Sequence, residues 1–212
     1  MLASIQKTIL DLLFPLSCIG CGAHDSLVCA GCLNSIPLLI KLVEHPTPHL
    51  DFVIIAGNYE HPLLKELVTL YKFHGVTELA EPLAGIMGRA LAVFPVQTAP
   101  VLVPVPLHWK RARARGYNQS ELLARRLAEN RGCNTQNLLR RVKATRSQAK
   151  LGRTERLKNV AGVFRGIGAV PTEVMLIDDI ATTFATLESA AGELKKHGAK
   201  HVGGLVIAKN NA

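Results

Sequence analysis

The sequence has no long apolar run and few acidic or aromatic residues. Its 212 residues are 48% hydrophobic and 5% aromatic, and no stretch approaches the roughly 20 uninterrupted apolar positions of a membrane-spanning helix. The N-terminal segment is amphipathic, carries Lys7 and Asp11, and lacks a small-residue cleavage site, so it is not typical of a signal peptide. The apolar fraction is too high for a disordered chain. We therefore expect a soluble, cytoplasmic protein without a membrane span.

Acidic residues are scarcest in one part of the chain. Overall, 25 Lys and Arg oppose 16 Asp and Glu, which gives a net charge of +9. The segment from Pro106 to Arg165 holds 16 basic and three acidic residues, a local +13, and the remaining 9 basic and 13 acidic residues leave −4. Twelve of the 16 are arginines, which suit bidentate phosphate recognition. The pattern favours an anionic partner (phosphate, pyrophosphate or nucleic acid) over the alternative, a solvated basic face.

Four of the five cysteines lie together in the segment CIGCGAHDSLVCAGC. Cys18, Cys21, Cys29 and Cys32 form a C-x2-C-x7-C-x2-C pattern, in which each pair can present two thiolates to one metal from a tight turn. Four sulfur ligands describe structural zinc, so we expect a small metal-bound module that is too short to fold by apolar burial alone. Two disulfides and an iron–sulfur cluster are the alternatives. The fifth cysteine, Cys133, is interpreted as a buried or incidental thiol.

The rest of the chain alternates strand and helix patterns. A proline-punctuated connector at 45–50 suggests a boundary between residues 1–45, with an N-terminal helix and the cysteine module, and residues 46–212. In the second part, strands are expected at 51–59, 100–107 and 137–143, helices at 62–73, 78–94, 118–132 and around 153–160, and a strand, loop, helix and strand over 173–209. This alternation predicts an α/β domain whose mostly parallel sheet is covered on both faces.

The most informative stretch is VMLIDDIATTFAT at 174–186. Four apolar residues predict a buried strand, and Asp178 and Asp179 stand at its carboxyl end, where open α/β sheets bind their ligands. These adjacent carboxylates face opposite sides of the strand and suit a diol or a metal-bound sugar better than acid–base chemistry. The residues that follow offer backbone N–H groups and hydroxyls to an anion at a helix N-terminus. They are Ala181, Thr182, Thr183, Phe184, Ala185 and Thr186. We interpret the stretch as a sugar 5-phosphate site; the alternative is an acidic strand end followed by an ordinary N-cap.

A basic loop is expected after the strand at 100–107. Its cations could clasp pyrophosphate or follow a nucleic-acid backbone; they are Lys110, Arg111, Arg113 and Arg115. Trp109 and Tyr117 flank them and could stack on exposed bases, although packing is the favoured interpretation for each. Farther along, residues 144–154 could fold over the site as a lid. That segment carries Arg146, Lys150 and Arg153.

The diaspartate stretch resembles the phosphoribosyl-pyrophosphate (PRPP) motif of the type I phosphoribosyltransferases. In that family the two acids contact the ribose hydroxyls and the loop binds the 5-phosphate, which implies these roles for Asp178, Asp179 and residues 181–186. The family usually has glycine where this chain has Phe184. Because glycine permits unusual dihedrals and close approach of the backbone to phosphate, this departure predicts weaker PRPP binding.

As an ordered set, five segments resemble the ComF/GntX family, phosphoribosyltransferase-like proteins linked to competence and DNA uptake. They are the cysteine module, YKFHG at 71–75, PVPLHWKRARARGYNQSELLA at 104–124, RSQAKLGRTERLKNVAGVF at 146–164, and the diaspartate strand. The resemblance implies a type I phosphoribosyltransferase fold with an N-terminal zinc module, and Mg-PRPP as ligand. It also implies a role in handling single-stranded DNA, with a helicase-like translocase or single-strand DNA-handling proteins as partners.

Three functions follow from these motifs. An enzyme would displace pyrophosphate from C1 of Mg-PRPP in favour of an unidentified acceptor, with Asp178, Asp179, Lys110 and Arg111 as catalytic candidates. A binding protein would hold PRPP as a ligand or signal and carry single-stranded DNA on its basic tract. A scaffold would use the basic face and the zinc module to dock a protein. The lack of an acceptor signature favours a phosphoribosyltransferase-like DNA-uptake protein; an active transferase is the alternative.

Overall fold

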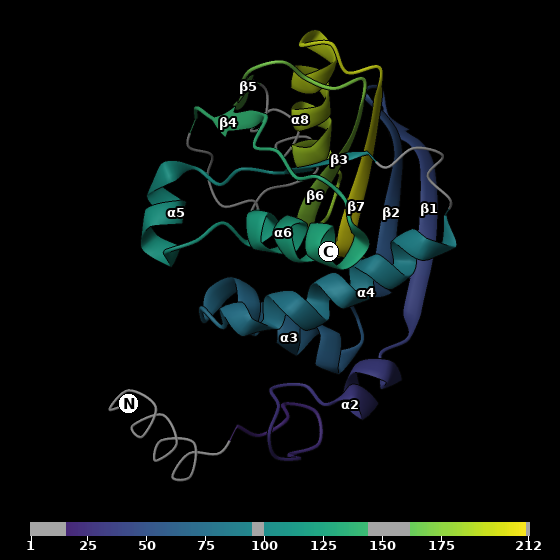
Figure 1. The fold of residues 1–212 in the computed structure, drawn as a ribbon, viewed down its shortest axis with the longest axis vertical. Helices are drawn as coiled ribbons and strands as arrows, with labels where there is room; N and C mark the ends of the chain where they lie inside the picture. Colours follow the sequence, from purple (N-terminus) through teal and green to yellow (C-terminus); the bar gives the residue numbers. More distant parts are fainter. Residues whose placement is uncertain (1–15, 95–99, 144–161, 211–212) are drawn as a thin grey trace.

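A five-stranded sheet forms the centre of the computed structural model, which describes residues 16–94, 100–143 and 162–210 (Figure 1). In spatial order its strands are β1 (Leu38–Thr47), β2 (Leu50–Asn58), β7 (His201–Lys209), β6 (Glu173–Ala181) and β3 (Val101–Pro104). β1 pairs antiparallel with β2, whereas β2, β7, β6 and β3 run parallel. The mostly parallel sheet predicted from the alternating pattern is therefore confirmed.

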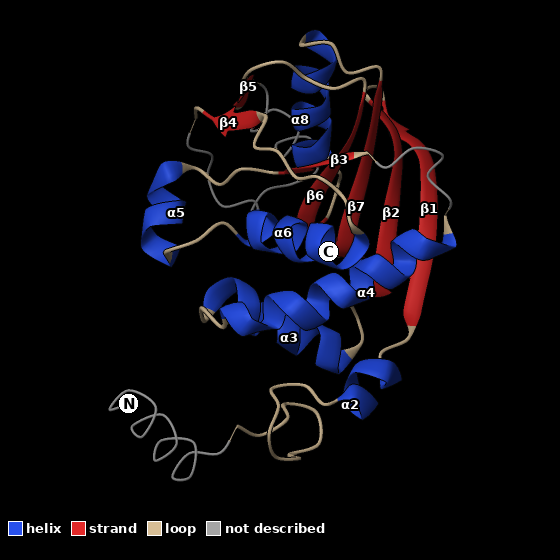
Figure 2. Cartoon of the chain, viewed as in Figure 1, coloured by secondary structure: helices blue, strands red, loops and turns tan. Residues whose placement is uncertain are grey.

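Helices cover both faces of this sheet (Figure 2). One face packs against α3 (Pro62–Phe73), α4 (Ala80–Val93, preceded by a 3-10 turn at Thr77–Leu79) and α6 (Gln119–Arg131). The other packs against α8 (Ala185–Lys196) and the small sheet of β4 (Leu139–Arg141) and β5 (Phe164–Gly166). Two short helices, α2 (Ala30–Ser35) and α5 (Trp109–Arg115), lie outside these layers (Figure 1).

The alternation of side chains along β6 shows how the sheet separates two cores. Met175 and Ile177 are buried on the side of α3, α4 and α6, whereas Val174 and Leu176 are buried on the side of α8. A strand buried on both faces has to be apolar at every position, which is why this part of the sequence is a continuous apolar run. That run ends at Asp178, so the two carboxylates are carried to the edge of the sheet by the strand itself.

The local sequence of α3 explains both its position and its start. Pro62 occupies the first turn, where the missing N–H has no helical partner. The buried side chains at 64, 67, 68 and 71 form one stripe at helical spacing. This stripe fixes the rotation of the helix, and its last turn carries Lys72 to the carboxyl end of β6.

Two segments differ from the prediction. Residues 45–50 form the end of β1 and the turn into β2 rather than a connector, because Thr47 pairs with Leu50. β1 escaped detection because it is an edge strand with register shifts and positive φ at Ile40 and His45, so its burial does not alternate regularly. The prolines at 46 and 48 are tolerated at an edge, where no ladder bond is required on the outer side.

The basic loop after β3 was also predicted wrongly, because the structure forms α5 there. His108 caps the helix by accepting the Lys110 N–H at Nδ1, and Gly116 ends it in the left-handed conformation with φ of 83°. Alanine and arginine between these caps are good helix formers. The N-terminal helix, the helix near 153–160 and the candidate lid with Arg146, Lys150 and Arg153 lie outside the described residues. None of the helices in the described ranges is long and apolar enough to cross a membrane.

Candidate functional site

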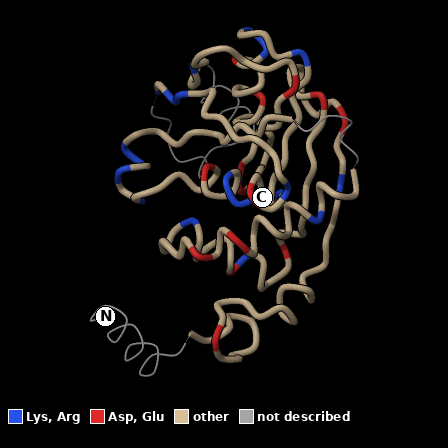
Figure 3. Tube along the Cα trace, viewed as in Figure 1, with Lys and Arg blue, Asp and Glu red and all other residues tan. Residues whose placement is uncertain are grey.

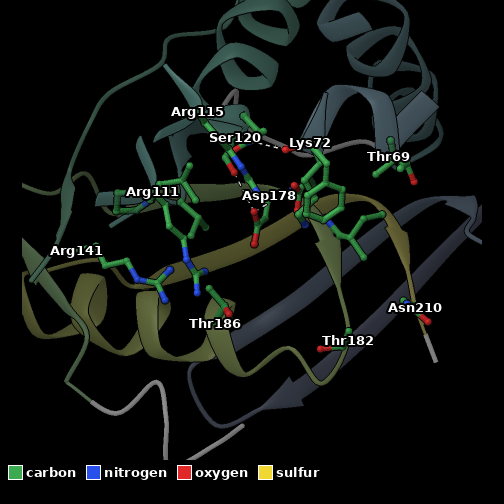
Figure 4. Close-up of a pocket in the computed structure, with 18 of the residues that line it drawn as sticks. Thr69, Lys72, Arg111, Arg115, Ser120, Arg141, Asp178, Thr182, Thr186 and Asn210 are labelled. Atoms are coloured by element: carbon green, nitrogen blue, oxygen red, sulfur yellow. Dashed lines mark hydrogen bonds and ion pairs between the residues drawn. The ribbon is translucent and has the colours of Figure 1, made fainter. Parts of the chain in front are cut away.

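A pocket of about 510 Å³ opens at the carboxyl ends of β3 and β6 (Figure 4). The last turn of α3, the helix α5, the first turn of α6 and the N-terminus of α8 contribute to its walls. Six of the residues predicted from the sequence line it: Asp178, Asp179, Thr182, Thr186, Arg111 and Arg115. Ala181, Thr183, Phe184 and Ala185 belong to the adjoining segment without lining the pocket, and Lys110 and Arg113 lie on the exposed side of α5.

The two carboxylates have different partners. Asp179 is buried, and its Oδ1 lies 2.8 Å from the ammonium of Lys72. Asp178 accepts a hydrogen bond of 2.8 Å from the Ser120 hydroxyl and one of 2.9 Å from the Asp179 N–H. Burial raises the pKa of Asp178 to about 6, and the negative charge of Asp179 adds to this rise. A carboxylate offers about four acceptor positions, more than these contacts use, so the pair can also accept hydrogen bonds from a diol.

The start of α6 is fastened to the end of α3 by reciprocal hydrogen bonds. The Tyr117 hydroxyl donates to the carbonyl oxygen of Tyr71, and the Tyr71 hydroxyl donates to the carbonyl oxygen of Gln119 over 2.7 Å. The Gln119 amide donates to the carbonyl oxygen of Lys72 over 3.4 Å. Tyr117 is half-buried, with its ring centroid 6.0 Å from that of Tyr71. Tyr117 packs against the core and against Tyr71, as the packing interpretation expected.

The two residues beside Gln119 also serve the pocket. The Asn118 amide donates to the carbonyl oxygen of Val105 over 3.2 Å, which holds the chain after β3 against α6. Ser120 is buried and reaches Asp178 across the pocket floor. The YNQS segment at 117–120 thus connects three elements that contribute to one pocket.

Further cationic and hydroxyl groups line the pocket besides Lys72 (Figure 4). Arg111 and Arg115 are four residues apart on one face of α5, and Arg141 extends from β4 with 9% of its surface exposed. Thr182 and Thr186 come from the end of β6 and the first turn of α8. A helix N-terminus and three guanidinium groups together favour an anion such as phosphate.

His108 caps the helix that carries Arg111 and Arg115, and its own side chain is uncharged. The side chain is 7% exposed, and burial lowers its pKa, with the charges of Arg141 and Lys110 acting in the same direction. The neutral ring keeps Nδ1 as an acceptor, which matches its role as the cap of α5. The cap therefore fixes the helix that presents Arg111 and Arg115.

Phe184 has a backbone conformation that favours glycine. Its φ of 59° and ψ of 4° place it in the left-handed region, directly before α8. The ring packs against the core on the α8 side, and the Lys209 ammonium lies 5.8 Å from the ring centroid. Glycine adopts this conformation without strain. The position therefore favours glycine in this chain too, although phenylalanine occupies it.

Lys72, Ser120, Arg141 and Asn210 also line the pocket but were not predicted as site residues. Two of them lay within motifs that carried the family resemblance, since Lys72 belongs to YKFHG and Ser120 to GYNQSELLA. That membership was a usable signal for a role. Arg141 and Asn210 stand in no motif, and only the tertiary structure brings them to the pocket.

The four N-terminal cysteines form a candidate metal centre. Their Sγ atoms all lie within 4.8 Å of one another, and those of Cys21 and Cys29 are 3.7 Å apart. Tetrahedral zinc with Zn–S distances of about 2.3 Å requires sulfurs about 3.8 Å apart, whereas a disulfide requires about 2.05 Å. An iron–sulfur cluster, with several atoms between its cysteines, would hold the sulfurs farther apart. The donor set therefore fits zinc.

The backbone around these cysteines is shaped for the cluster. The Cys29 N–H donates to Cys18 Sγ over 3.3 Å, and this bond is the main reason that the pKa of the Cys18 thiol falls to about 6, which favours the thiolate that a metal needs. At Gly20 an added Cβ would lie 2.7 Å from Cys32 Sγ, so the knuckle requires glycine. Cys133 lies outside the cluster and is half-buried.

These features define an α/β protein that carries a four-cysteine metal module and a cationic pocket with a carboxylate pair. No family model matches the chain. Over 194 residues the chain is 31% identical to DNA utilization protein YhgH of Salmonella typhimurium, which covers 87% of this chain and 80% of that protein. Over 165 residues it is 30% identical to competence protein F of Haemophilus influenzae, covering 73% of this chain and 71% of that protein. The chain therefore belongs to the ComF family.

Two further comparisons cover a smaller share of this chain. Competence protein ComFC of Bacillus subtilis is 33% identical over 139 residues, 64% of this chain and 55% of that protein. Among solved structures, TT1426 of Thermus thermophilus aligns with 62% of this chain and 84% of its own, at 16% identity and a TM-score of 0.39, which is too low to support an inference.

Proposed function

We propose that this chain acts in DNA uptake or utilization, binding PRPP in the pocket and single-stranded DNA on the exposed side of α5. The names of the relatives, DNA utilization protein and competence protein, support the cellular role. The observation that carries the ligand is the pairing, within one pocket, of adjacent carboxylates with arginines and threonines at a helix N-terminus. A helicase-like translocase or a single-strand DNA-handling protein would deliver or receive the strand.

The two ends of the pocket match the two ends of a ribose phosphate. The hydroxyls of ribose need acceptors, which Asp178 and Asp179 provide at the end of β6. The 5-phosphate needs donors and positive charge, which Thr182, Thr186 and the N-terminus of α8 provide. The guanidinium groups that line the pocket carry the positive charge that suits the pyrophosphate, which has the larger negative charge. The magnesium that accompanies PRPP would enter on this pyrophosphate.

The exposed side of α5 suits single-stranded DNA. Trp109 is 60% exposed, and the Lys110 ammonium lies 5.5 Å from its ring centroid. Phe73 is 66% exposed and lines the pocket, so its ring adds a second exposed aromatic face near this side of α5. Basic residues line α5 along the trace of the chain (Figure 3). Aromatic faces beside cations can stack bases and neutralise phosphates without regard to sequence.

A second candidate function is phosphoribosyl transfer, favoured by the arginines that line the pocket. The bond from C1 to pyrophosphate would break, an acceptor would form the new bond to C1, and Arg111 would stabilise the leaving pyrophosphate. Lys110, predicted as catalytic, lies outside the pocket and fits the DNA surface instead. Release of pyrophosphate from PRPP in the presence of candidate acceptors would demonstrate this activity.

The pocket-facing side and the exposed side of α5 can be tested separately, each with both ligands. Arg111→Ala with Arg115→Ala removes the pocket-facing cations, and Lys110→Ala with Arg113→Ala removes the exposed ones. We expect the first pair to weaken PRPP binding in calorimetry by at least about tenfold, since each lost bond to a charged group is worth about 1.5–3 kcal/mol. We expect the second pair to leave PRPP binding unchanged and to lower the salt slope of single-stranded oligonucleotide binding by about 1.4.

The carboxylate pair supplies the control for the pocket. Asp178→Asn with Asp179→Asn should abolish PRPP binding and preserve oligonucleotide binding, because neither residue lies on the exposed side of α5. PRPP binding that survives this double change would contradict the assignment of the pocket. Equal effects of both α5 variants on both ligands would contradict the division of that helix.

A further inference from the structure

One cation of the pocket is already paired with a carboxylate before any ligand arrives. The Lys72 ammonium lies 2.8 Å from Asp179 Oδ1, and the two side chains are 26% and 8% exposed. The residues are 107 positions apart in sequence, so this pair is built by the fold and not by local spacing. Removing one partner of such a pair leaves a buried charge without compensation.

Hydrogen bonds from neighbouring side chains hold the backbone of Lys72 in place. The Gln119 amide binds the carbonyl oxygen of Lys72, and the Tyr117 hydroxyl binds that of Tyr71. Lys72 also stands in the last turn of α3, where the helix dipole favours a cation. Contacts between the start of α6 and the end of α3 therefore hold the residue that places its ammonium beside Asp179 (Figure 4).

The side chains that line the pocket carry enough positive charge to neutralise a phosphate without a metal ion. Among the described residues that line it, four are basic and two are acidic. Lys72 is paired with Asp179, and the other three cations that line the pocket are Arg111, Arg115 and Arg141. Magnesium binds through one or two carboxylates in near-octahedral geometry. A fixed ammonium 2.8 Å from one of the two carboxylates repels a divalent ion that approaches the pair.

From this geometry we propose that Lys72 takes the place of a divalent cation at the carboxylate pair, so that the pocket binds ribose phosphates without a metal ion on Asp178 or Asp179. Lys72 is then a specificity-determining residue. It keeps the carboxylates available to ribose hydroxyls as hydrogen-bond acceptors and denies them to metals. This inference rests on the proposed sugar-phosphate function, but its claim about metals concerns the protein alone.

Two measurements test the proposal. Ribose 5-phosphate, which lacks the metal-binding pyrophosphate, is titrated calorimetrically into the zinc-loaded protein with and without magnesium. Magnesium is removed with a chelating resin from the buffer only, because a soluble chelator would also attack the cysteine site. Separately, Mn²⁺ binding to the protein without sugar phosphate is followed by electron paramagnetic resonance. Lys72→Met is compared with Lys65→Met, which removes an exposed lysine of the same helix outside the pocket.

We expect the natural protein and Lys65→Met to bind ribose 5-phosphate equally with and without magnesium, and to show no Mn²⁺ binding that depends on Asp178. Lys72→Met should lose at least about tenfold in magnesium-free affinity, regain part of it with magnesium, and bind Mn²⁺. Lys72→Arg retains the charge and should behave as the natural protein, which tests the proposal even if the methionine variant does not fold.

Two results would overturn the proposal. One is a tenfold or greater gain in the affinity of the natural protein for ribose 5-phosphate on adding magnesium. The other is Mn²⁺ binding to the natural protein that is lost in Asp178→Asn. If no variant binds ribose 5-phosphate under any condition, the sugar-phosphate function fails, and the Mn²⁺ measurements still decide whether Lys72 excludes metals from the carboxylates.

Discussion

At the residue scale, Phe184 shows a conflict between side chain and backbone. A left-handed conformation costs a non-glycine residue about 1–2 kcal/mol, and the buried part of the ring offsets this cost. Glycine removes the strain and loses the ring, whereas alanine keeps the strain and also loses the ring. We therefore expect Phe184→Gly to be more stable than Phe184→Ala by about 1 kcal/mol in urea unfolding.

The same pair of variants bears on the pocket. Glycine lets a phosphate approach the backbone before α8, so Phe184→Gly should bind PRPP at least as tightly as the natural protein. If the alanine variant proves as stable as the glycine variant, the left-handed conformation at this position is wrong.

Asp178 makes the stability of the protein depend on pH. Burial raises its pKa from 3.8 to about 6. Such a carboxyl favours the folded state while it is protonated, below pH 3.8, and this contribution is lost as the pH rises through about 6. Asp178→Asn carries no charge at any pH and can still accept from Ser120. We expect it to be more stable than the natural protein by about 3 kcal/mol at pH 7, and by less than about 1 kcal/mol near pH 4.

Chemical unfolding at a series of pH values measures this difference. A stability advantage of Asp178→Asn that is the same at both ends of the range would show that the carboxyl is not perturbed by its surroundings. A loss of stability at pH 7 would show that its charge is compensated in the folded protein.

The residues that could be predicted from the sequence are those whose position follows from their own strand or helix. Asp178 and Asp179 end a short apolar run, which predicts a buried strand where strand and helix patterns alternate, and the carboxyl end of such a strand is a ligand-binding edge. Lys72 and Arg141 approach the pocket from distant elements. Lys72 is marked only by its place in the YKFHG segment and Arg141 by no motif, because the role of each depends on how α3 and β4 pack.

At the scale of elements, the buried strands could be predicted from the sequence, whereas the edge strand β1 and the outer helix α5 could not. The central strands β2, β6 and β7 are apolar because both their faces are covered. β1 lies at the edge of the sheet and its burial is irregular. The helix α5 has no buried residue, and its capping residues His108 and Gly116 define its two ends. Neither has the periodicity that identifies a strand or a helix.

The cysteine module is the element whose stability we expect to depend most on a bound ion. Cys18 is its buried cysteine, and partly buried residues such as Ile19 and Leu33 pack on the core beside α3 and α4. We expect Cys18→Ser to lower zinc affinity by more than about a hundredfold and to make the module sensitive to proteolysis. Cys133→Ser is the matched control, since that cysteine lies outside the cluster.

Metal content by mass spectrometry and limited proteolysis distinguish these variants. The pocket lies at the carboxyl edge of the sheet and is lined by no residue of the module, so PRPP binding should survive Cys18→Ser. Equal zinc content in the two variants would rule out the four-cysteine centre.

At the scale of the whole molecule, the sheet separates two cores and brings its chemistry to one edge. The end of β6, the last turn of α3, the first turn of α6 and the N-terminus of α8 meet there, each because an apolar face fixes it on one side of the sheet. The exposed cations of α5 lie beside this edge. A sugar phosphate in the pocket and a DNA strand on α5 would therefore be neighbours.

The most direct test of this account is a crystal structure of the protein with ribose 5-phosphate. We predict that the phosphate lies at Thr182, Thr186 and the N-terminus of α8, and that the ribose hydroxyls lie at Asp178 and Asp179. A phosphate bound instead at Lys110 and Arg113, with the carboxylates untouched, would contradict the account and leave the exposed side of α5 as the anion-binding surface.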